Sequence, residues 1–140
     1  MLPQEAPCVR KETGKLNNQA IFVRDCPLEK IFFVQFSDGE KFDPPFSKEH
    51  PWYLEGEAHQ FTWSKHARPF PYETEPGGYM PVAEVARAWI VETGYTGWLS
   101  MEIFDRRMRD INSQVAHAAM RGLESWRKLK HELEATQAKV

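Results

Sequence analysis

Two short apolar runs, separated by a long irregular stretch, dominate the hydrophobic pattern of the chain. Residues 31–36 are apolar at every position but one and are followed by a Ser-Asp-Gly turn signal, which predicts a buried strand. Residues 98–104 alternate, so that Leu99 and Met101 share one face while Glu102 lies on the other. The pattern therefore predicts a second strand with one apolar and one partly polar face.

Helical spacing appears between these strands and again after the second one. Pro81 begins a predicted helix and Gly94 ends it. Its apolar stripe is formed by Val82, Val85, Ala86, Trp89 and Ile90. A last helix is expected after a cap at Asn112 or Ser113. Its predicted stripe is Val115, Ala119, Gly122, Trp126, Leu129 and Leu133. The order strand, long loop, helix, strand, helix predicts an α/β fold with parallel strands joined by crossovers.

The stretch from residue 38 to residue 80 is broken by prolines and by a Gly-Gly pair, so no long regular element is expected there. It is also rich in aromatic side chains. A loop of this length in a small domain is usually functional, which favours a lid or a binding wall. Residues 1–27 are predicted to be a flexible or atypical lead-in, residues 28–134 the folded unit, and residues 135–140 a tail.

Composition narrows the classes of function. The chain has 140 residues, 41% of them hydrophobic and 27% charged, with a formal net charge of -2. An ordinary composition with a near-neutral charge argues against a nucleic-acid partner or an anionic membrane surface. No apolar run approaches the roughly 20 residues that span a bilayer, and the first residues do not form a secretion signal. Two cysteines without metal-ligand spacing are expected to be free thiols, which predicts a cytoplasmic protein.

Two polar residues near the strand ends are the first candidates for chemistry. Gln35 and Glu102 each lie toward the carboxyl end of a predicted strand, where the active sites of α/β barrels are found. An amide oxygen and a carboxylate are hard ligands that suit Mg²⁺ or Mn²⁺, which can polarise a carbonyl group. The alternative, in which both side chains are solvated or paired with Arg or Lys, stays open because polar strand ends are common.

A short basic group in the loop is the second candidate. Lys65, His66 and Arg68 lie next to Phe70 in the sequence and could receive the carboxylate of a small acidic substrate. A solvated charge run is the alternative. The histidines show none of the spacings that are typical of a zinc site.

Several motifs together resemble one enzyme family. Residues 94–104 (GYTGWLSMEIF) are similar to the last-strand motif of the xylose-isomerase-like group of sugar-phosphate isomerases and epimerases, and residues 33–38 (FVQFSD) are similar to an earlier ligand strand. The resemblance covers about residues 28 to 130 and continues through the segments WSKHARPFP (63–71), GYMPV (78–82) and RGLESWRKL (121–129).

This resemblance implies the carboxyl-terminal part of a (β/α)8 TIM barrel, an incomplete barrel because a whole one takes about 250 residues. It implies a divalent metal (Mg²⁺, Mn²⁺ or Co²⁺) with Gln35 and Glu102 as ligands. Full-length relatives supply two further ligands, a Glu and an Asp, from preceding strands that are not expected in this segment. The implied catalytic candidates are Lys65, His66 and Arg68, and the implied substrate contacts are Ser37, Phe70 and Tyr79.

Within the group, Gln35 favours one branch. Epimerases usually have His at this position, whereas 3-dehydroshikimate dehydratases often have Gln. The resemblance thus implies a lyase that converts 3-dehydroshikimate to protocatechuate in quinate and shikimate breakdown. One alternative is a sugar or sugar-phosphate isomerase on the same barrel. Another is a non-catalytic truncated barrel that acts only through oligomerisation, since open strand edges promote association. The expected partners are a hydroxylated cyclic acid or a sugar, and a second copy of the chain.

Overall fold

The computed structural model describes residues 18–110 and 115–137. In chain order the elements are α1 (Asn18–Asp25), η1 (Leu28–Lys30), β1 (Phe33–Phe36), α2 (His59–Ser64), β2 (Ala67–Arg68), α3 (Val82–Ala86), η2 (Arg87–Glu92), β3 (Trp98–Met101), β4 (Phe104–Asp105), η3 (Arg106–Arg109) and α4 (Val115–Gln137). The mixed helix and strand content agrees with the predicted α/β class.

The strands form two small sheets. β1 pairs with β3 in parallel, in a register that runs from Phe33 opposite Trp98 to Phe36 opposite Met101. This parallel pair confirms the predicted crossover between the two apolar runs. β2 pairs with β4 in antiparallel fashion, which places Arg68 opposite Phe104. Both sheets are two-stranded. The described residues therefore form no barrel, and barrel architecture stays an inference from resemblance.

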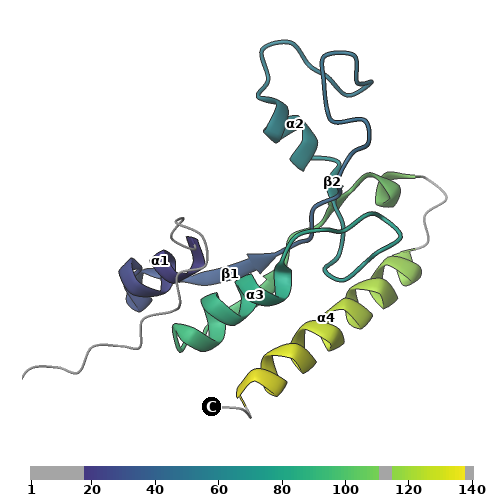
Figure 1. The fold of residues 1–140 in the computed structure, drawn as a ribbon. Helices are drawn as coiled ribbons and strands as arrows, with labels where there is room; N and C mark the ends of the chain where they lie inside the picture. Colours follow the sequence, from purple (N-terminus) through teal and green to yellow (C-terminus); the bar gives the residue numbers. More distant parts are fainter. Residues whose placement is uncertain (1–17, 111–114, 138–140) are drawn as a thin grey trace, which may run out of the picture.

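One face of the β1–β3 pair is covered by helices. Val34 and Phe36 point into the core with 5% and 4% of their surface exposed. They pack with residues of α3, η2 and α4, namely Val82, Ala86, Ile90, Leu129 and Leu133, and with Tyr95. Figure 1 shows α3 and α4 running beside each other. Apolar burial on this single face is the main stabilising contribution visible in the chain.

The helix predicted from Pro81 is present, with Pro81 at its cap position. Its predicted stripe is confirmed: three of the five residues are buried, and Val85 and Trp89 pack against the same cluster. The second half, η2, has π-helical hydrogen bonding, which the sequence did not predict. The helix stops before Gly94, whose φ of 74° is a conformation that glycine adopts at little cost.

The last helix is present, but part of its predicted stripe is wrong. Leu129 is 1% exposed and Leu133 9%, as expected, whereas Val115 is 84% exposed and Trp126 37%. Ser125, not Trp126, belongs to the buried line of the helix, and its Oγ donates a hydrogen bond to the carbonyl oxygen of Pro71 (2.8 Å). The expected cap at Asn112 or Ser113 lies outside the described residues. No helix in the described part of the chain is both long enough and apolar enough to cross a membrane.

The segment from residue 38 to residue 80, here called the lid segment, leaves the sheet after β1 and returns through β2. Figure 1 shows the part with α2 projecting away from α3 and α4. As predicted, it holds only short elements. At the other end of the molecule, α1 forms within the stretch expected to be a lead-in. The Phe22 ring of α1 lies 5.2 Å from the Trp89 ring, so this helix packs onto η2.

Candidate functional site

The carboxyl ends of β1 and β3 bring three of the predicted site residues, Gln35, Ser37 and Glu102, to one end of the sheet. Gln35 lies opposite Ser100 in the strand register. Two residues further along each strand, Ser37 and Glu102 follow on the same faces. The backbone N–H of Glu102 donates to the carbonyl oxygen of Phe36 (3.0 Å), which extends the pairing beyond the strand ends. Active sites of parallel α/β folds gather at this end of the strands.

Arg68 joins this group from the lid segment. Its Nε donates to the Oγ of Ser37 (2.9 Å), and its Nη2 donates to Oε2 of Glu102 (2.7 Å). The guanidinium carbon lies 5.1 Å from the ring centre of Phe104, so the guanidinium packs against this ring. Three predicted site residues that are distant in sequence, Ser37, Arg68 and Glu102, are thus in direct contact.

The Arg68 group is partly exposed to solvent. The side chain of Arg68 is 22% exposed and that of Glu102 is 41% exposed. Arg68 reaches this place because residues 38–40 and β4 flank β2: the N–H of Asp38 donates to the oxygen of Pro69 (3.0 Å), and that of Glu40 to the oxygen of Ala67 (2.8 Å). A guanidinium held on rigid backbone is suited to binding a carboxylate, because its N–H groups match the two oxygens.

Gln35 and Glu102 fit a divalent metal in part. Both offer oxygen donors from neighbouring strands on one face, which is the chemistry that Mg²⁺ and Mn²⁺ prefer. Two side chains fill only part of an octahedral shell, and one of them is already paired with Arg68. Among the described residues, no group of three His, Cys, Asp or Glu side chains could hold a metal ion. The metal site therefore stays a prediction.

The other two catalytic candidates face the lid segment itself. Lys65 forms an ion pair with Glu57, and its Nζ lies 4.3 Å from the ring centre of Phe61. The Nδ1 of His66 lies 2.9 Å from the carbonyl oxygen of Thr62. The His66 ring stacks on Trp52, with ring centres 4.4 Å apart and an interplanar angle of 12°. The structure brings neither side chain into contact with Arg68.

The two aromatic candidates for substrate contact occupy different environments. Phe70 is only 8% exposed, and the guanidinium of Arg121 lies 5.4 Å from its ring centre. Its ring packs so closely against α4 that a Cβ at Gly122 would lie 3.0 Å from Phe70 Cε1. Tyr79 is 57% exposed and is free to approach a ligand. Phe70 is placed as a support of α4, and Tyr79 as part of the surface.

The sequence did not indicate the role of Asp38. This buried carboxylate accepts hydrogen bonds at Oδ1 from the backbone N–H groups of Gly39 (2.7 Å), Tyr79 (3.1 Å) and Met80 (2.9 Å). It therefore ties the start of the lid segment to its end. The Ser37-Asp38-Gly39 pattern predicts only a turn, because nothing in a sequence shows which distant backbone groups a carboxylate will meet.

An ionic network that links the lid segment to β4, η3 and α4 was also missed. Arg121 bonds both oxygens of Glu73 (2.6 and 2.8 Å) and reaches Asp105 Oδ2 (2.7 Å). Asp105 also pairs with Arg107 Nε (2.6 Å) and is fully buried. Glu40 pairs with Arg106 through two contacts, one of 2.8 Å. These pairs anchor the segment that carries Arg68.

Contacts within the network shift the pKa values of its own members. Burial is the largest influence on Asp105 and favours its neutral form, but hydrogen bonds from Arg121 and Arg107 together hold the pKa of Asp105 below its usual value. Hydrogen bonds to Glu73, and then to Asp105, raise the pKa of Arg121. The ionised network is therefore the stable form at neutral pH.

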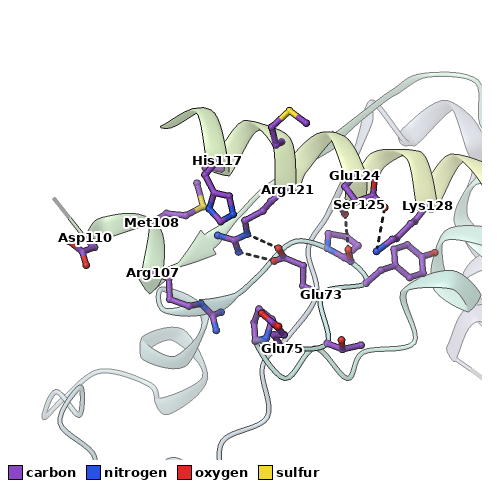
Figure 2. Close-up of a pocket in the computed structure, with 16 residues that line it drawn as sticks. Glu73, Glu75, Arg107, Met108, Asp110, His117, Arg121, Glu124, Ser125 and Lys128 are labelled. Carbon is purple, nitrogen blue, oxygen red and sulfur yellow. Dashed lines mark hydrogen bonds and ion pairs between the residues drawn. The ribbon is translucent and has the colours of Figure 1, made fainter. Parts of the chain in front are cut away.

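A hollow lies beside α4, away from the Arg68 group. It has a volume of about 980 Å³ and is lined by residues from the lid segment, η3 and α4. Figure 2 shows Arg121 reaching across it from α4 to Glu73, with His117 and Met108 at one side. None of Gln35, Ser37, Arg68 and Glu102 lines it. Its strongest charges are used within the network, so it is a weaker candidate site.

Comparison with known proteins supports one relationship. No family model matches the chain, and no solved structure matches it. The chain is 39% identical over 132 residues to a protein from Neurospora crassa named 3-dehydroshikimate dehydratase. The match covers 94% of this chain and 35% of the relative, so the chain spans about a third of the length of the curated relative it matches. The resemblance to this enzyme is confirmed, and the wider isomerase and epimerase grouping stays a prediction.

Proposed function

We propose that the chain provides the carboxyl-terminal part of a (β/α)8-barrel lyase of the 3-dehydroshikimate dehydratase type. The similarity to the Neurospora crassa protein supports the reaction class. The parallel β1–β3 pair, with polar residues at its carboxyl end, supports the barrel origin. The substrate in this proposal is a hydroxylated cyclic acid, 3-dehydroshikimate, which loses water to give protocatechuate.

The observation that carries this proposal is the contact of Arg68 with Ser37 and Glu102. Arg68 is the residue that we assign to the substrate carboxylate, because its fork of N–H groups matches that anion. Ser37 positions Arg68 by accepting from Nε, and Phe104 supports the guanidinium. The carboxylate would thereby be bound at the strand ends, with the ring of the substrate extending over Gln35.

Gln35 and Glu102 are the residues proposed to hold a divalent metal. When bound, such a metal supplies Lewis-acid polarisation of a carbonyl group. Because the chain offers only these two positions, the remaining ligands of the proposed site would come from other strands. Tyr79, at the exposed edge of the lid segment, is proposed as a further substrate contact.

A direct assay tests the function. The protein is incubated with Mn²⁺ and 3-dehydroshikimate, and the absorbance of protocatechuate is followed. We expect product formation that falls by at least about tenfold in Arg68→Gln and Glu102→Gln, because a lost charge-assisted contact at a site costs about 1.5–3 kcal/mol. Arg127→Gln, which removes a positive charge from the exposed side of α4, is the matched control and should match the unmodified chain. Absence of product from a folded, Mn²⁺-bound chain would contradict lyase activity of this chain by itself.

A further inference from the structure

The sheet and the helical layer both end without a neighbour at one side of the molecule. β1 and β3 form a two-stranded parallel sheet, so in the described part of the chain one edge of β3 has no strand beside it. α4 packs on the core through Leu129 and Leu133. Along another side of the same helix, Met120, Leu123 and Trp126 are 60%, 41% and 37% exposed. The open edge of β3 and this bare side of α4 are here called the β3–α4 surface.

The other end of the helical layer is covered. There α1 packs onto η2, with the ring centres of Phe22 and Trp89 5.2 Å apart. On a different side, η2 contacts α4. The layer therefore has a covered end at α1 and a bare end at α4, so the exposed apolar side chains of α4 mark one particular side of the fold.

The rules of parallel sheets say what fits this side. Parallel strands are joined by crossovers, and the crossovers are right-handed, so strands added in one direction place their helices side by side on one face. α3, η2 and α4 agree with this rule, because all three pack on the face that carries Val34 and Phe36. A further parallel strand beside β3 would therefore bring its helix next to Met120 and Leu123 of α4.

The same occupant accounts for the outer face of the sheet. Phe33 and its register partner Trp98 are 61% and 83% exposed on that face. Strands with apolar residues on both faces are typical of parallel sheets that are covered on both sides. Because sheets twist, several strands added at one edge curl over the face of the first pair. One partner can thus cover the strand edge, the helix side and the outer face.

The relative has the length of chain that such an occupant needs. The match covers 94% of this chain and 35% of the relative, so about two thirds of the relative lies outside the matched residues. A second copy of this chain fits less well. Related by a two-fold axis, it would meet the edge of β3 in antiparallel fashion and would not continue the parallel order.

We propose that the β3–α4 surface is a docking surface for a separate polypeptide that carries parallel β–α segments, of the kind that the relative holds outside the matched residues. The inference rests on the proposed function for the barrel origin of the strands. It adds that this chain docks as a preformed module, because its own core is already closed: Ala86 and Leu129 are 0% and 1% exposed.

The probe is the Neurospora crassa relative with its matched segment deleted, co-expressed with the tagged chain so that the two polypeptides fold together. We expect the probe to co-purify with the chain, and light scattering should give the mass of a one-to-one complex. Backbone N–H groups of β3 should exchange with solvent more slowly in the complex than in the chain alone, because a parallel neighbour pairs with the open edge.

A pair of matched variants locates the contact. Leu123→Asp places a charge in the β3–α4 surface and should weaken the complex by at least about tenfold, because an unpaired charge buried in an interface is costly. Leu54→Asp is the control: Leu54 is 54% exposed but lies in the lid segment, whose α2 part projects away from α4 (Figure 1). Dilution of each complex, followed by light scattering, measures the dissociation, and circular dichroism verifies that each variant is folded.

The possible results separate the two proposals. Failure of the probe to co-purify would overturn the inference, whereas protocatechuate made by the chain alone would leave the lyase proposal standing. Equal binding by Leu123→Asp and Leu54→Asp, or unchanged exchange in β3, would also overturn the inference. So would a dimer of the chain alone with slow exchange in β3, because a second copy would then be the occupant. A one-to-one complex with both signatures that forms no protocatechuate would support the inference and contradict the lyase activity.

Discussion

The two faces of the β1–β3 pair differ sharply, although the same four-residue strands supply both. On the helix-covered face, Val34 and Phe36 are 5% and 4% exposed. On the opposite face, Phe33 is 61% exposed and its register partner Trp98 is 83% exposed. Strands with apolar residues on both faces are typical of parallel sheets that are buried on both sides. The described chain provides the cover for one side only.

This difference separates what stabilises the fold from what positions the site. The covered face stabilises the chain by apolar burial. The site at the carboxyl end of the bare face is held by polar contacts instead: the Asp38 hydrogen bonds and the network around Asp105 and Arg121. We therefore expect changes on the covered face to lower global stability at every pH, and changes in the network to lower stability only where Asp105 is ionised.

The largest effect is expected from the covered face. Leu129→Ala removes a side chain that is 1% exposed and leaves a cavity beneath the sheet. The free energy of unfolding, measured by urea denaturation, should fall by about 2–5 kcal/mol. Leu123→Ala is the matched control, because it lies on the same helix with 41% exposure and should change stability by less than about 1 kcal/mol. Similar losses in both variants would mean that α4 is covered on two sides.

An intermediate effect is expected from the buried end of the ionic network. Because the folded-state pKa of Asp105 lies below its unfolded value of about 3.9, its ionised form stabilises the protein above that pH. This stability should be lost as the pH falls through the folded-state pKa. We expect Asp105→Asn to be less stable than the unmodified chain at pH 6 by about 1–3 kcal/mol, and the difference to shrink by pH 3. Urea denaturation at both pH values measures it; a constant difference would show that the carboxylate charge is not the cause.

The covered face was the part most accessible from sequence, for a physical reason. A stripe such as Val82, Ala86 and Ile90 repeats at the spacing of a helix, and the apolar strands carry a local signal, so periodicity alone predicts both. In α4, Ser125 is buried and contacts the distant Pro71. Periodicity predicts Trp126 in the buried stripe, and no local pattern indicates this tertiary hydrogen bond.

The site was predictable only as a set of separate residues. Strand position and resemblance predict Gln35 and Glu102, and a short basic group in the loop predicts Arg68. In the structure, Arg68 contacts both Ser37 and Glu102. The fold of the lid segment determines which residues pair, Arg68 with Glu102 and Lys65 with Glu57. Its path is set by contacts between residues far apart in sequence, such as Asp38 with Met80. No local pattern encodes these contacts.

The smallest effect is expected on the bare face, and it decides whether that face is bare in solution. Trp98→Ser removes the most exposed aromatic side chain of the sheet without opening a cavity in the described chain. For a monomer, the free energy of unfolding should change by no more than about 0.5 kcal/mol. If a second copy covers the face, the loss should be larger and should grow with protein concentration, because association stabilises the folded state by mass action. Urea denaturation at two protein concentrations, together with the molecular mass from light scattering, separates the two results. A small change in the free energy of unfolding that does not depend on concentration means that no second copy of the chain covers this face.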